Sequence, residues 1–575
     1  MPSSFSEVGL EAGIRWQELT AGKQPWIRIG TALCGEAAGA FEVADAVDSA
    51  LASQGVSAEV SRVGCLGLCF AEPLLDVQLP GGHRIFYGNV DIESVSEIIS
   101  THVAGGSPIA AKALGYLAEE GSTAPVPDGI PDLSQHPMKV WENRIVLRNA
   151  GNIDPLDILQ YVANGGYQAL HKALTNLDRE ETLEEVKASG LRGRGGAAFP
   201  TATKWSFLAG NPATEKYVLC NCEEGDPGAF NDKNILESDP HTLVEGVIIA
   251  GYATGASKGY IFIRHGHDGP IERCRAAVNQ AREQGFLGEN IMGSDFSYEI
   301  EIALTGDSYV AGEESALMEA IEGKRAMPRF RPPFPAQVGL FGKPTNINNV
   351  KTLSYVPEIV SKGGEWFASI GHDTSTGTVI LCLSGKLKYT GMVEVPLGIN
   401  LKDVIYEAAG GMKEGKVLKF LQTGGPLGGV LGADNIDVLL DFEVLRTAGA
   451  IVGSGGLIAA DDETCIVDLT RSLIAFCQYE SCGKCFPCRM GMSHLLEVLE
   501  RLCQLEGTQE DLALMQDIGV NMQAGSLCGH GQLGFNPVSS ALRYFGPEFD
   551  THIKDHICPT GTCLEPRFSP AASRR

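Results

Sequence analysis

Apolar and polar residues alternate along this chain with a spacing that changes from one segment to the next. Near the start, strand-like apolar runs occupy 25–34 and 83–90, and apolar residues recur at helical spacing over 40–55 and 91–103. Strands and helices that alternate over such short distances are typical of a small α/β unit. We expect this unit to comprise residues 1–115.

A larger α/β body follows a linker. Pro, Gly and Asp gather at 121–137 and predict a connecting segment, which we place at 116–139. Beyond it, a glycine-rich body over 140–370 contains predicted strands and helices in alternation. The strands are expected at 216–221 and 258–264, and the helices at 241–256 and 270–285.

The last third of the chain changes character twice. Over 371–450 the helical spacing disappears, and alternating apolar residues, as in 378–398, predict a small β-rich unit. Helical spacing returns over 451–545. A tail over 546–575 ends in EPRFSPAASRR, which predicts disorder at its tip. The predicted fold class is therefore multidomain α/β.

Composition excludes several classes of partner. The 575 residues include 45 basic and 71 acidic side chains, for a formal net charge of −26, which argues against binding nucleic acid or an anionic membrane surface. The N-terminus lacks the basic and apolar regions of a secretory signal. The longest apolar run, 448–460, is too short and too rich in glycine to cross a bilayer. We expect a cytoplasmic protein, either free or on the cytoplasmic face of a membrane complex, in which sixteen cysteines favour metal or redox chemistry over disulfides.

Cys482, Cys485 and Cys488 are spaced two residues apart in ESCGKCFPCRMG, with no fourth cysteine close by. Cys488 opens a predicted helix, whose free N–H groups and dipole favour an anionic metal–thiolate centre. The best candidate for the fourth ligand is Cys528, because its glycine-rich loop lets the backbone approach closely. Four thiolates suit a [4Fe–4S] cluster or structural zinc, and the C-x2-C-x2-C spacing favours the cluster. Buried, unreactive thiols are the remaining alternative.

A glycine-rich segment over 188–205 contains the spacing G-x-G-x-x-A from Gly193 to Ala198. A dinucleotide-binding fingerprint should follow a strand, but the residues upstream have helical spacing. The segment is therefore better explained as a cradle of backbone N–H groups for a phosphate and a ring, with Arg194 and Lys204 supplying charge. A flexible glycine loop is the alternative.

Residues 140–545 resemble the NADH-oxidising flavoprotein family. The resemblance rests on the cysteine triplet and on four segments: GLRGRGGAAFPTATKW, CNCEEGDPGAFNDK, YVAGEESALMEAIEGKRAMPRFRPPFPAQ and GKPTNINNVKTL. That family includes the 51-kDa, F-type subunit of respiratory complex I. It also includes the diaphorase (beta) subunits of NAD-linked hydrogenases, some of them electron-bifurcating, and of formate dehydrogenases.

The resemblance implies a Rossmann-like domain that binds FMN and NAD(H), next to a [4Fe–4S] cluster. FMN would be held by residues of these motifs, namely Gly193, Arg194, Gly195, Lys204, Asn221, Glu223, Tyr309, Gly312, Glu313, Asn348 and Asn349. NADH would be held by three aromatic rings and two carboxylates, namely Phe199, Phe207, Phe334, Glu314 at the ribose and Asp226 at the nicotinamide. Ordinary core packing is the alternative for the three phenylalanines.

The implied function is that of an NADH dehydrogenase subunit. NADH would give a hydride to FMN, and electrons would leave singly through the cluster, so that the cofactors carry the chemistry. The implied partners are an E-type (24-kDa-like) thioredoxin-fold [2Fe–2S] subunit and a catalytic or electron-accepting subunit. The chain departs from the family pattern at Asp307, Ser308, Ala311 and Arg331. The alternative is an electron-relay or assembly subunit that has lost flavin.

Cys34, Cys65 and Cys69 resemble ligands of a thioredoxin-like [2Fe–2S] ferredoxin, and the resemblance implies that fold for the N-terminal unit. The first cysteine of that pattern is missing, and Ile29 and Gly30 occupy its region. Such a centre normally takes four protein ligands. A cluster with a substitute ligand and a cluster-free docking domain both remain open.

The segment HIKDHICPTGTC gathers His552, His556, Cys558 and Cys563 near the end of the chain. Some hydrogenase-type relatives look similar here and recruit a cysteine from upstream, a position that Cys465 matches. The resemblance implies a zinc site made by Cys465, His552, Cys558 and Cys563, with the mixed sulfur and nitrogen set that structural zinc prefers. Solvated thiols and an iron site are the alternatives. Residues 371–450 resemble the β-grasp (SLBB) insert of the family.

Overall fold

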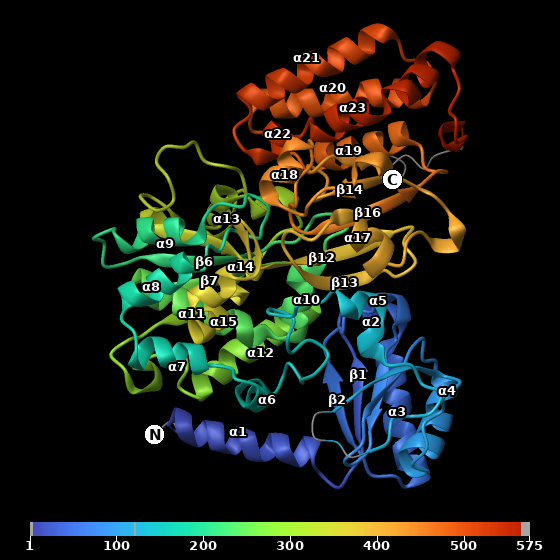
Figure 1. Cartoon of the computed structure of the whole chain (residues 1–575). Coiled ribbons are helices and arrows are strands. Elements are labelled where there is room, and N and C mark those ends of the chain that lie inside the picture. Colours follow the sequence, from blue (N-terminus) through green and yellow to red (C-terminus); the bar gives the residue numbers. More distant parts are fainter. Residues whose placement is uncertain (1–3, 120–121, 123, 565–575) are drawn as a thin grey trace.

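The computed structural model describes residues 4–119, 122 and 124–564, so the predicted disordered tip of the tail lies outside the described residues. Figure 1 shows four regions of the chain in contact: an N-terminal unit, an α/β body, a β-rich unit beside the body, and a bundle of helices at the top. The predicted multidomain α/β class is confirmed. Among the described residues, no helix combines the length and the apolar character that a membrane span needs.

The N-terminal unit is a five-stranded mixed sheet covered by helices. Its strands lie in the order β2-β1-β3-β4-β5, with β1 parallel to β2 and antiparallel to β3. Their bounds are Trp26–Gly30 (β1), Glu59–Val63 (β2), Leu75–Gln78 (β3), Arg84–Tyr87 (β4) and Ala113–Leu117 (β5). The predicted helices are present as α3 (Ala40–Gln54) and as α4 (Ile92–Glu97), which continues into a π-helix over Ile98–Ala104.

The first helix of the chain, α1 (Phe5–Thr20), runs from the N-terminal unit to the α/β body (Figure 1). It packs against α6 (Ile158–Ala163), and the Phe5 ring stacks on His171 with centroids 4.8 Å apart. The first helix of the unit expected over residues 1–115 therefore packs against the next unit, the α/β body.

The α/β body is built on a parallel sheet with the strand order β8-β7-β6-β9. The bounds are Tyr217–Cys222 (β6), Lys258–Arg264 (β7), Glu299–Thr305 (β8) and Thr345–Asn349 (β9). Successive strands are added on one side of β6, and then β9 is added on its other side. Ligands bind at such a reversal in α/β sheets, outside the carboxyl ends of the strands.

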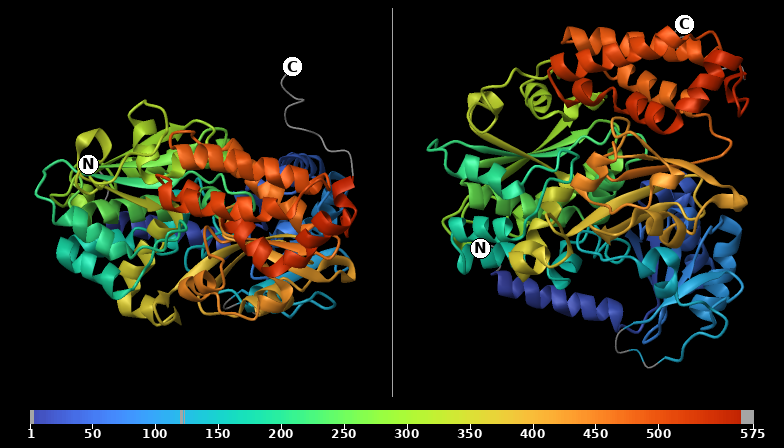
Figure 2. Two further views of the ribbon diagram at one scale, coloured as in Figure 1. Left: turned by 90° about the horizontal axis from the view of Figure 1, so that it is seen from above. Right: turned by 45° about the horizontal axis from the view of Figure 1, so that its top comes forward.

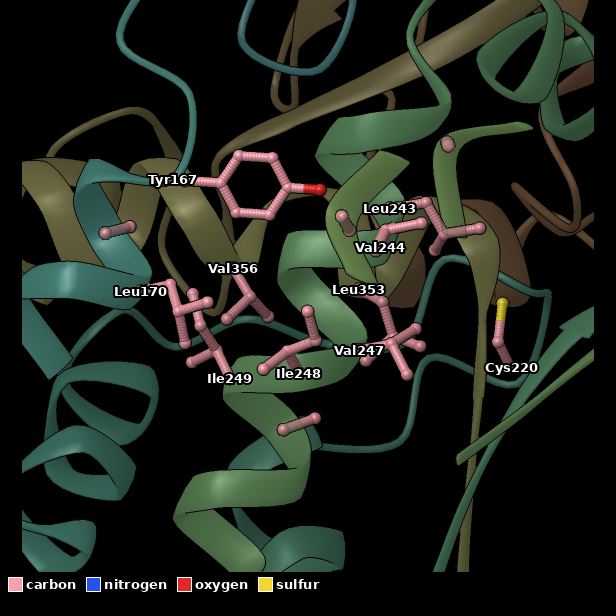
Figure 3. Packing of buried hydrophobic residues seen from close by; sticks show 14 of the residues in the cluster. Tyr167, Leu170, Cys220, Leu243, Val244, Val247, Ile248, Ile249, Leu353 and Val356 are labelled. Carbon is pink, nitrogen blue, oxygen red and sulfur yellow. The ribbon is translucent and has the colours of Figure 1, made fainter. Parts of the chain in front are cut away.

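One helix forms the centre of the body's hydrophobic core. Nearly every residue of α11 (Pro240–Thr254) is buried, as expected for a helix that is apolar on all sides. Figure 3 shows Val244, Val247 and Ile248 of this helix packed towards Leu353 and Val356. Several helices of the body surround it, among them α9 (Thr201–Ala209), α10 (Asn231–Ser238), α12 (Asp268–Glu283) and α14 (Val350–Ser354). The sheet and its carboxyl-end residues therefore rest on a rigid base.

The β-rich unit contains a five-stranded sheet with the order β13-β12-β16-β14-β15. The bounds are Thr378–Gly385 (β12), Gly391–Pro396 (β13), Leu418–Thr423 (β14), Val430–Gly432 (β15) and Gly456–Asp461 (β16). The central strand β16 lies beyond the boundary expected at residue 450, because it pairs with both β12 and β14. The sheet therefore includes residues that the sequence pattern assigned to the next unit.

The helical bundle lies over one side of the β-rich unit and of the body (Figure 2). Its helices are α19 (Ile466–Tyr479), α20 (Phe486–Cys503), α21 (Gln509–Gly525), α22 (Gly529–Leu533) and α23 (Asn536–Asp550). Helix α20 begins with Pro487 in its first turn, where the missing N–H of proline costs nothing. The predicted helix next to the cysteine triplet is confirmed.

A buried carboxylate fastens the β-rich unit to the body. Glu394 on β13 accepts hydrogen bonds from the backbone N–H groups of Ile145, Val146 and Leu147, at 2.9–3.2 Å. It also accepts one from the Thr378 hydroxyl at 2.6 Å. Burial raises the pKa of Glu394, while these four donors lower it.

Replacing Glu394 with Gln should lower the free energy of unfolding by about 2–4 kcal/mol, because an amide cannot satisfy donors that a carboxylate accepts. The urea midpoint of the purified chain measures this change. Glu407→Gln, at an exposed position of the same unit, is the control and should leave the midpoint nearly unchanged. Equal midpoints for wild type and Glu394→Gln would show that this carboxylate does not stabilise the junction.

Candidate functional site

Polar residues gather at the carboxyl ends of β6 and β9, where the strand order reverses. Asn221 Nδ2 donates to the backbone oxygen of Gly312 at 2.7 Å. Asn348 Oδ1 accepts from the indole N–H of Trp205 at 2.8 Å. The structure therefore brings together Asn221, Gly312 and Asn348, three residues predicted to hold FMN, at the edge where an α/β sheet binds ligands.

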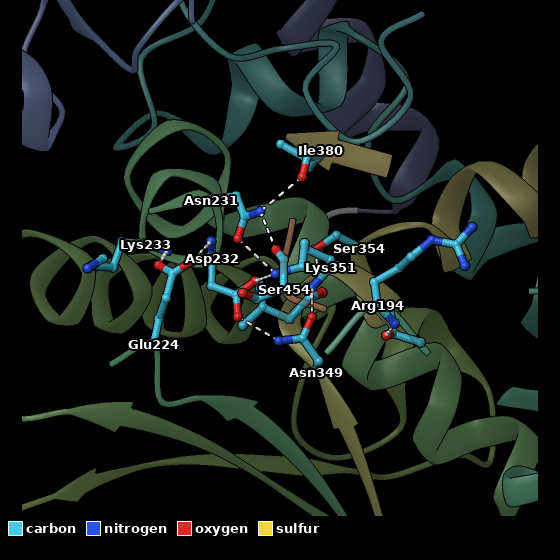
Figure 4. Close-up of polar contacts among 12 residues, drawn as sticks. Arg194, Glu224, Asn231, Asp232, Lys233, Asn349, Lys351, Ser354, Ile380 and Ser454 are labelled. Carbon is cyan, nitrogen blue, oxygen red and sulfur yellow. Dashed lines mark hydrogen bonds and ion pairs between the residues drawn. The ribbon is translucent and has the colours of Figure 1, made fainter. Parts of the chain in front are cut away.

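A buried polar network joins α10 to the end of β9 (Figure 4). Lys351 Nζ lies 2.7 Å from Asp232 Oδ1 and 2.8 Å from Asn231 Oδ1, and the lysine and aspartate side chains are at most 4% exposed. Asn349 Nδ2 donates to the other oxygen of Asp232. Glu224 accepts from two backbone N–H groups at the start of α10. Sequence reasoning assigned no role to Asp232, Lys351 or Glu224, although all three lie in or beside the quoted motifs.

The glycine-rich segment forms a tight loop against this network. Gly193 N donates to the Phe199 oxygen at 2.8 Å, which closes the loop on itself. A Cβ at Gly195 would lie 2.8 Å from Asn349 Cβ, so only glycine permits this approach. Gly196 has a φ of 113°, a conformation that residues with side chains rarely adopt. These backbone constraints support a cradle rather than a flexible loop.

The Arg194 side chain does not supply charge to this cradle, contrary to prediction. Its guanidinium donates to the backbone oxygens of Arg192, Thr376 and Thr378, at 2.6–3.1 Å. Figure 4 shows the side chain directed away from Asn349 and Lys351. The planar guanidinium is thus committed to fastening the loop to the β-rich unit, and the backbone N–H of Arg194 is also engaged, donating to Thr352 Oγ1 at 2.9 Å.

Paired charges lie on the opposite side of the loop. Lys204, on α9, forms an ion pair with Glu314 at the start of α13 (Glu314–Ile321). Arg331 lies 2.5 Å from Glu313 and 3.6 Å from Glu314. Glu313 also caps α13 by accepting from its first N–H groups. The structure therefore places two residues predicted for FMN, Lys204 and Glu313, next to Glu314, which was predicted for NADH.

Glu223 follows β6 and is almost fully buried. Burial raises its pKa to about 8, while the nearby Arg264, 2.9 Å away, acts in the opposite direction. A Cβ at Gly312 would lie 3.1 Å from Glu223 Oε2, which explains the glycine there. Asp307, one of the departures from the family pattern, also pairs with Arg264, but its side chain is 80% exposed.

The three phenylalanines predicted to stack on NADH are not core residues. Phe199, Phe207 and Phe334 are 47%, 57% and 55% exposed, so the alternative of ordinary core packing is wrong. Asp226 is buried instead, and burial raises its pKa. One of its oxygens accepts from the Ser454 hydroxyl at 2.6 Å, and the other has no hydrogen-bond partner among the described residues.

Tyr309 connects this region to the helical bundle. Its backbone N–H donates to Glu480 at 2.9 Å. Its ring lies edge-on to Phe476, with centroids 5.5 Å apart, and 5.7 Å from the ring of His530. His530 lies two residues after Cys528, and its Nε2 donates to the Cys477 backbone oxygen. Aromatic rings, of which Tyr309 and Phe476 are partly buried, therefore lie between the strand ends and the cysteine-rich loop.

The structure brings Cys528 to the cysteine triplet. Cys485 is the residue before α20, Cys488 lies in its first turn, and Cys528 immediately precedes α22. Burial raises the pKa of Cys488 to about 12, and the charges of Cys485, Cys528 and Cys482 add to the shift. A Cβ at Gly531 would lie 2.9 Å from Cys488 Cβ, so a glycine lets the two helix tips approach.

Two further groups of metal-ligating side chains are present. Cys465, His552, Cys558 and Cys563 place their ligand atoms within 4.8 Å of one another, as do Cys34, Cys65 and Cys69. In the first group, the separations among Cys465 Sγ, His552 Nε2 and Cys563 Sγ are 3.5–3.7 Å. The neighbouring His556 instead bonds the Leu505 oxygen.

Three family models match this chain. The Nuo51 FMN-binding domain matches residues 186–358, the SLBB domain matches 380–431, and the NADH-ubiquinone oxidoreductase-F iron-sulfur binding region matches 468–552. The first covers the strand ends and the glycine-rich loop, and the third covers the cysteine triplet and Cys528.

Two relatives and one solved structure agree with these matches. The NADP-reducing hydrogenase subunit HndC of Solidesulfovibrio fructosivorans is 44% identical over 73% of this chain and 85% of its own length. An F-type NADH-quinone oxidoreductase subunit of Rhizobium meliloti is 42% identical over 72% of this chain and 99% of its own length. A crystal structure of NAD+-reducing [NiFe]-hydrogenase in the H2-reduced state superposes with a TM-score of 0.63 and 27% identity, covering 99% of this chain and 92% of that one.

Replacing Arg194 with Met should lower both the free energy of unfolding, by about 2–3 kcal/mol, and the affinity for flavin. Three backbone carbonyls would lose their charged donor, and the loop would lose its attachment. Urea midpoints and flavin retention on dialysis measure the two effects. The exposed Arg325→Met is the control. Loss of flavin without loss of stability would show that the guanidinium acts on the flavin directly.

Proposed function

The chain belongs to the family of F-type subunits of NADH-quinone oxidoreductases, and from this membership we propose the residue roles described below. It is an NADH dehydrogenase module, in which oxidation of NADH is coupled to an electron relay. The observation that carries this function is the contact, through Tyr309, between an FMN-type strand-end site and a site with four cysteines.

We propose that FMN binds over the carboxyl ends of β6 and β9. FMN supplies a centre that accepts a hydride and releases single electrons. The fit is supported by glycines that let the backbone approach neighbouring side chains closely, at Gly195 beside Asn349 and at Gly312 beside Glu223. The side-chain amides of Asn221 and Asn348 would orient the ring, and the backbone of the glycine-rich loop would bind the phosphate.

NADH would bind across the open side of the same site. The exposed rings of Phe199, Phe207 and Phe334 offer stacking surface for adenine, worth on the order of 1 kcal/mol per pair beyond burial. The unpaired oxygen of Asp226 suits a carboxamide N–H donor. Glu314 would bond the ribose and repel a 2′-phosphate, which favours NADH over NADPH. These side chains would position the nicotinamide against the flavin.

Cys482, Cys485, Cys488 and Cys528 would hold the [4Fe–4S] cluster, with the N-terminus of α20 stabilising its negative charge. Tyr309 and His530 lie between the cluster ligands and the strand ends. Electrons would leave for partner subunits, which we propose to be an E-type [2Fe–2S] subunit and a catalytic or electron-accepting subunit. The names of the relatives, both of them subunits, support a hetero-oligomer.

Two further metal groups are part of the proposal. Cys465, His552, Cys558 and Cys563 would hold zinc, because ligands on one tetrahedral ion with Zn–S of about 2.3 Å lie roughly 3.8 Å apart, close to the separations found here. Cys34, Cys65 and Cys69, whose sulfurs lie within 4.8 Å of one another, would provide three ligands of a [2Fe–2S] centre.

Cys528→Ser should abolish the electron paramagnetic resonance signal of the NADH-reduced [4Fe–4S] cluster and remove about four irons per chain. The protein should stay yellow and still bleach with NADH, because the strand ends are intact. Cys274→Ala, in the core of α12, is the control and should retain the signal. An unchanged signal in Cys528→Ser would refute the ligand set, and a wild type without flavin absorbance would favour the relay function.

Cys563→Ser should reduce zinc from about one ion per chain to near zero, because three ligands hold zinc less tightly than four. Reduction of the flavin by NADH should be unaffected. His556→Ala serves as the control, since that histidine adjoins the group but bonds a backbone oxygen. Unchanged zinc content in Cys563→Ser, measured by mass spectrometry of the purified chain, would end the zinc assignment.

A further inference from the structure

The N-terminal cysteine group has three sulfurs and a gap in its ligand set. Cys34 lies in the first turn of α2 (Leu33–Ala38), Cys65 follows β2, and Cys69 begins the 3-10 turn Cys69–Ala71. The Sγ atoms of Cys65 and Cys69 are 3.8 Å apart. The backbone N–H of Gly67 points at the Cys65 sulfur at 3.2 Å. This arrangement suits metal-bound thiolates, but an iron–sulfur centre with two irons needs a fourth ligand.

The end of β1 supplies no such ligand. Adjacent residues of a strand point to opposite faces, and Ile29 is fully buried in the hydrophobic core of the N-terminal sheet. Gly30 points to the other face and has no side chain. A Cβ built there would lie 3.3 Å from both carboxylate oxygens of Glu72. The Glu72 carboxylate therefore occupies the place into which a side chain at position 30 would project.

Glu72 is a buried carboxylate with an unused oxygen. The residue is 7% exposed, and Oε2 accepts from the Leu74 backbone N–H at 2.8 Å. Oε1 is buried and has no hydrogen-bond partner among the described residues. Burying a carboxylate without a cation or a full set of donors is costly. The local arginines are engaged elsewhere, since Arg28 and Arg84 both pair with Asp76 at 2.8 Å.

The Glu72 carboxylate lies beside the three-sulfur group without being a member of it. Burial raises the pKa of Glu72, and the charge of Cys65 lies close enough to add to the shift. Each iron of a [2Fe–2S] centre takes two protein ligands, so three sulfurs leave one place open for the carboxylate.

We propose that Glu72 is the fourth protein ligand of an iron–sulfur centre held by Cys34, Cys65 and Cys69. The proposal rests on the [2Fe–2S] occupancy proposed above and assigns the ligand that it lacks. Binding would give Oε1 a cation and remove the cost of its burial. It would also place one carboxylate oxygen, a harder ligand than thiolate, on an iron.

Glu72→Ala and Glu72→Cys in the full-length chain test this assignment. We expect Glu72→Ala to lose about two irons and two acid-labile sulfides per chain, while flavin content and the [4Fe–4S] signal stay at wild-type levels. Glu72→Cys should retain these irons but shift the g-values of the reduced centre, because all its ligands would be sulfur. The shift keeps the assignment testable if Glu72→Ala proves unstable.

Glu237→Gln is the matched control. Its carboxylate is also buried near the group, but it accepts from the Leu33 backbone N–H at 2.7 Å, so its loss should leave iron content unchanged. Full iron content with unshifted g-values in both Glu72 variants would overturn the role of Glu72 alone. A wild type without a second iron–sulfur signal would overturn the [2Fe–2S] occupancy, and this inference with it.

Discussion

Lys351 and Asp232 face each other at 2.7 Å with almost no access to solvent. Such a pair is costly to bury unless further hydrogen bonds complete it, and here Asn231 and Asn349 provide them. Each of these partners leads to another part of the molecule. Asn349 touches the glycine-rich loop at Gly195, and Asn231 Nδ2 donates to backbone oxygens at 380 and 454 in the β-rich unit. This ion pair therefore links the strand ends to the glycine-rich loop and to the β-rich unit.

Two of the rings between the strand ends and the cysteine-rich loop carry no charge. Burial raises the pKa of Tyr309 well above its ordinary value and lowers that of His530, so both rings remain neutral. Charges are placed at the edges, where Lys204, Glu314 and Arg331 pair on the open side.

Apolar spacing was sufficient to predict β6, β7, α3 and α12, because their buried faces are regular. It missed β9, whose sequence TNINN is polar and is buried only because tertiary partners satisfy its amides. Cysteine spacing singled out Cys482, Cys485 and Cys488, and the family resemblance implied the other two cysteine groups, whose side chains the structure brings close together. The partners of Arg194 and the place of Glu72 could not be read from the sequence. Both depend on backbone atoms brought close by folding, such as the oxygen of Thr376, which is 182 residues away from Arg194.

Helix α10 has a different neighbour at each end. Its first residues, Asn231 and Asp232, belong to the flavin network, while Ser238 at its other end accepts from the backbone N–H of Cys65 at 3.2 Å. Eight residues at 1.5 Å each make a rod about 12 Å long. A Cβ on Gly64 would collide with Ser238, so the rod and the cysteine loop are in direct contact. The N-terminal unit is consequently held directly against the domain in which we propose the flavin site, and α10 is the element that joins its cysteine loop to that site.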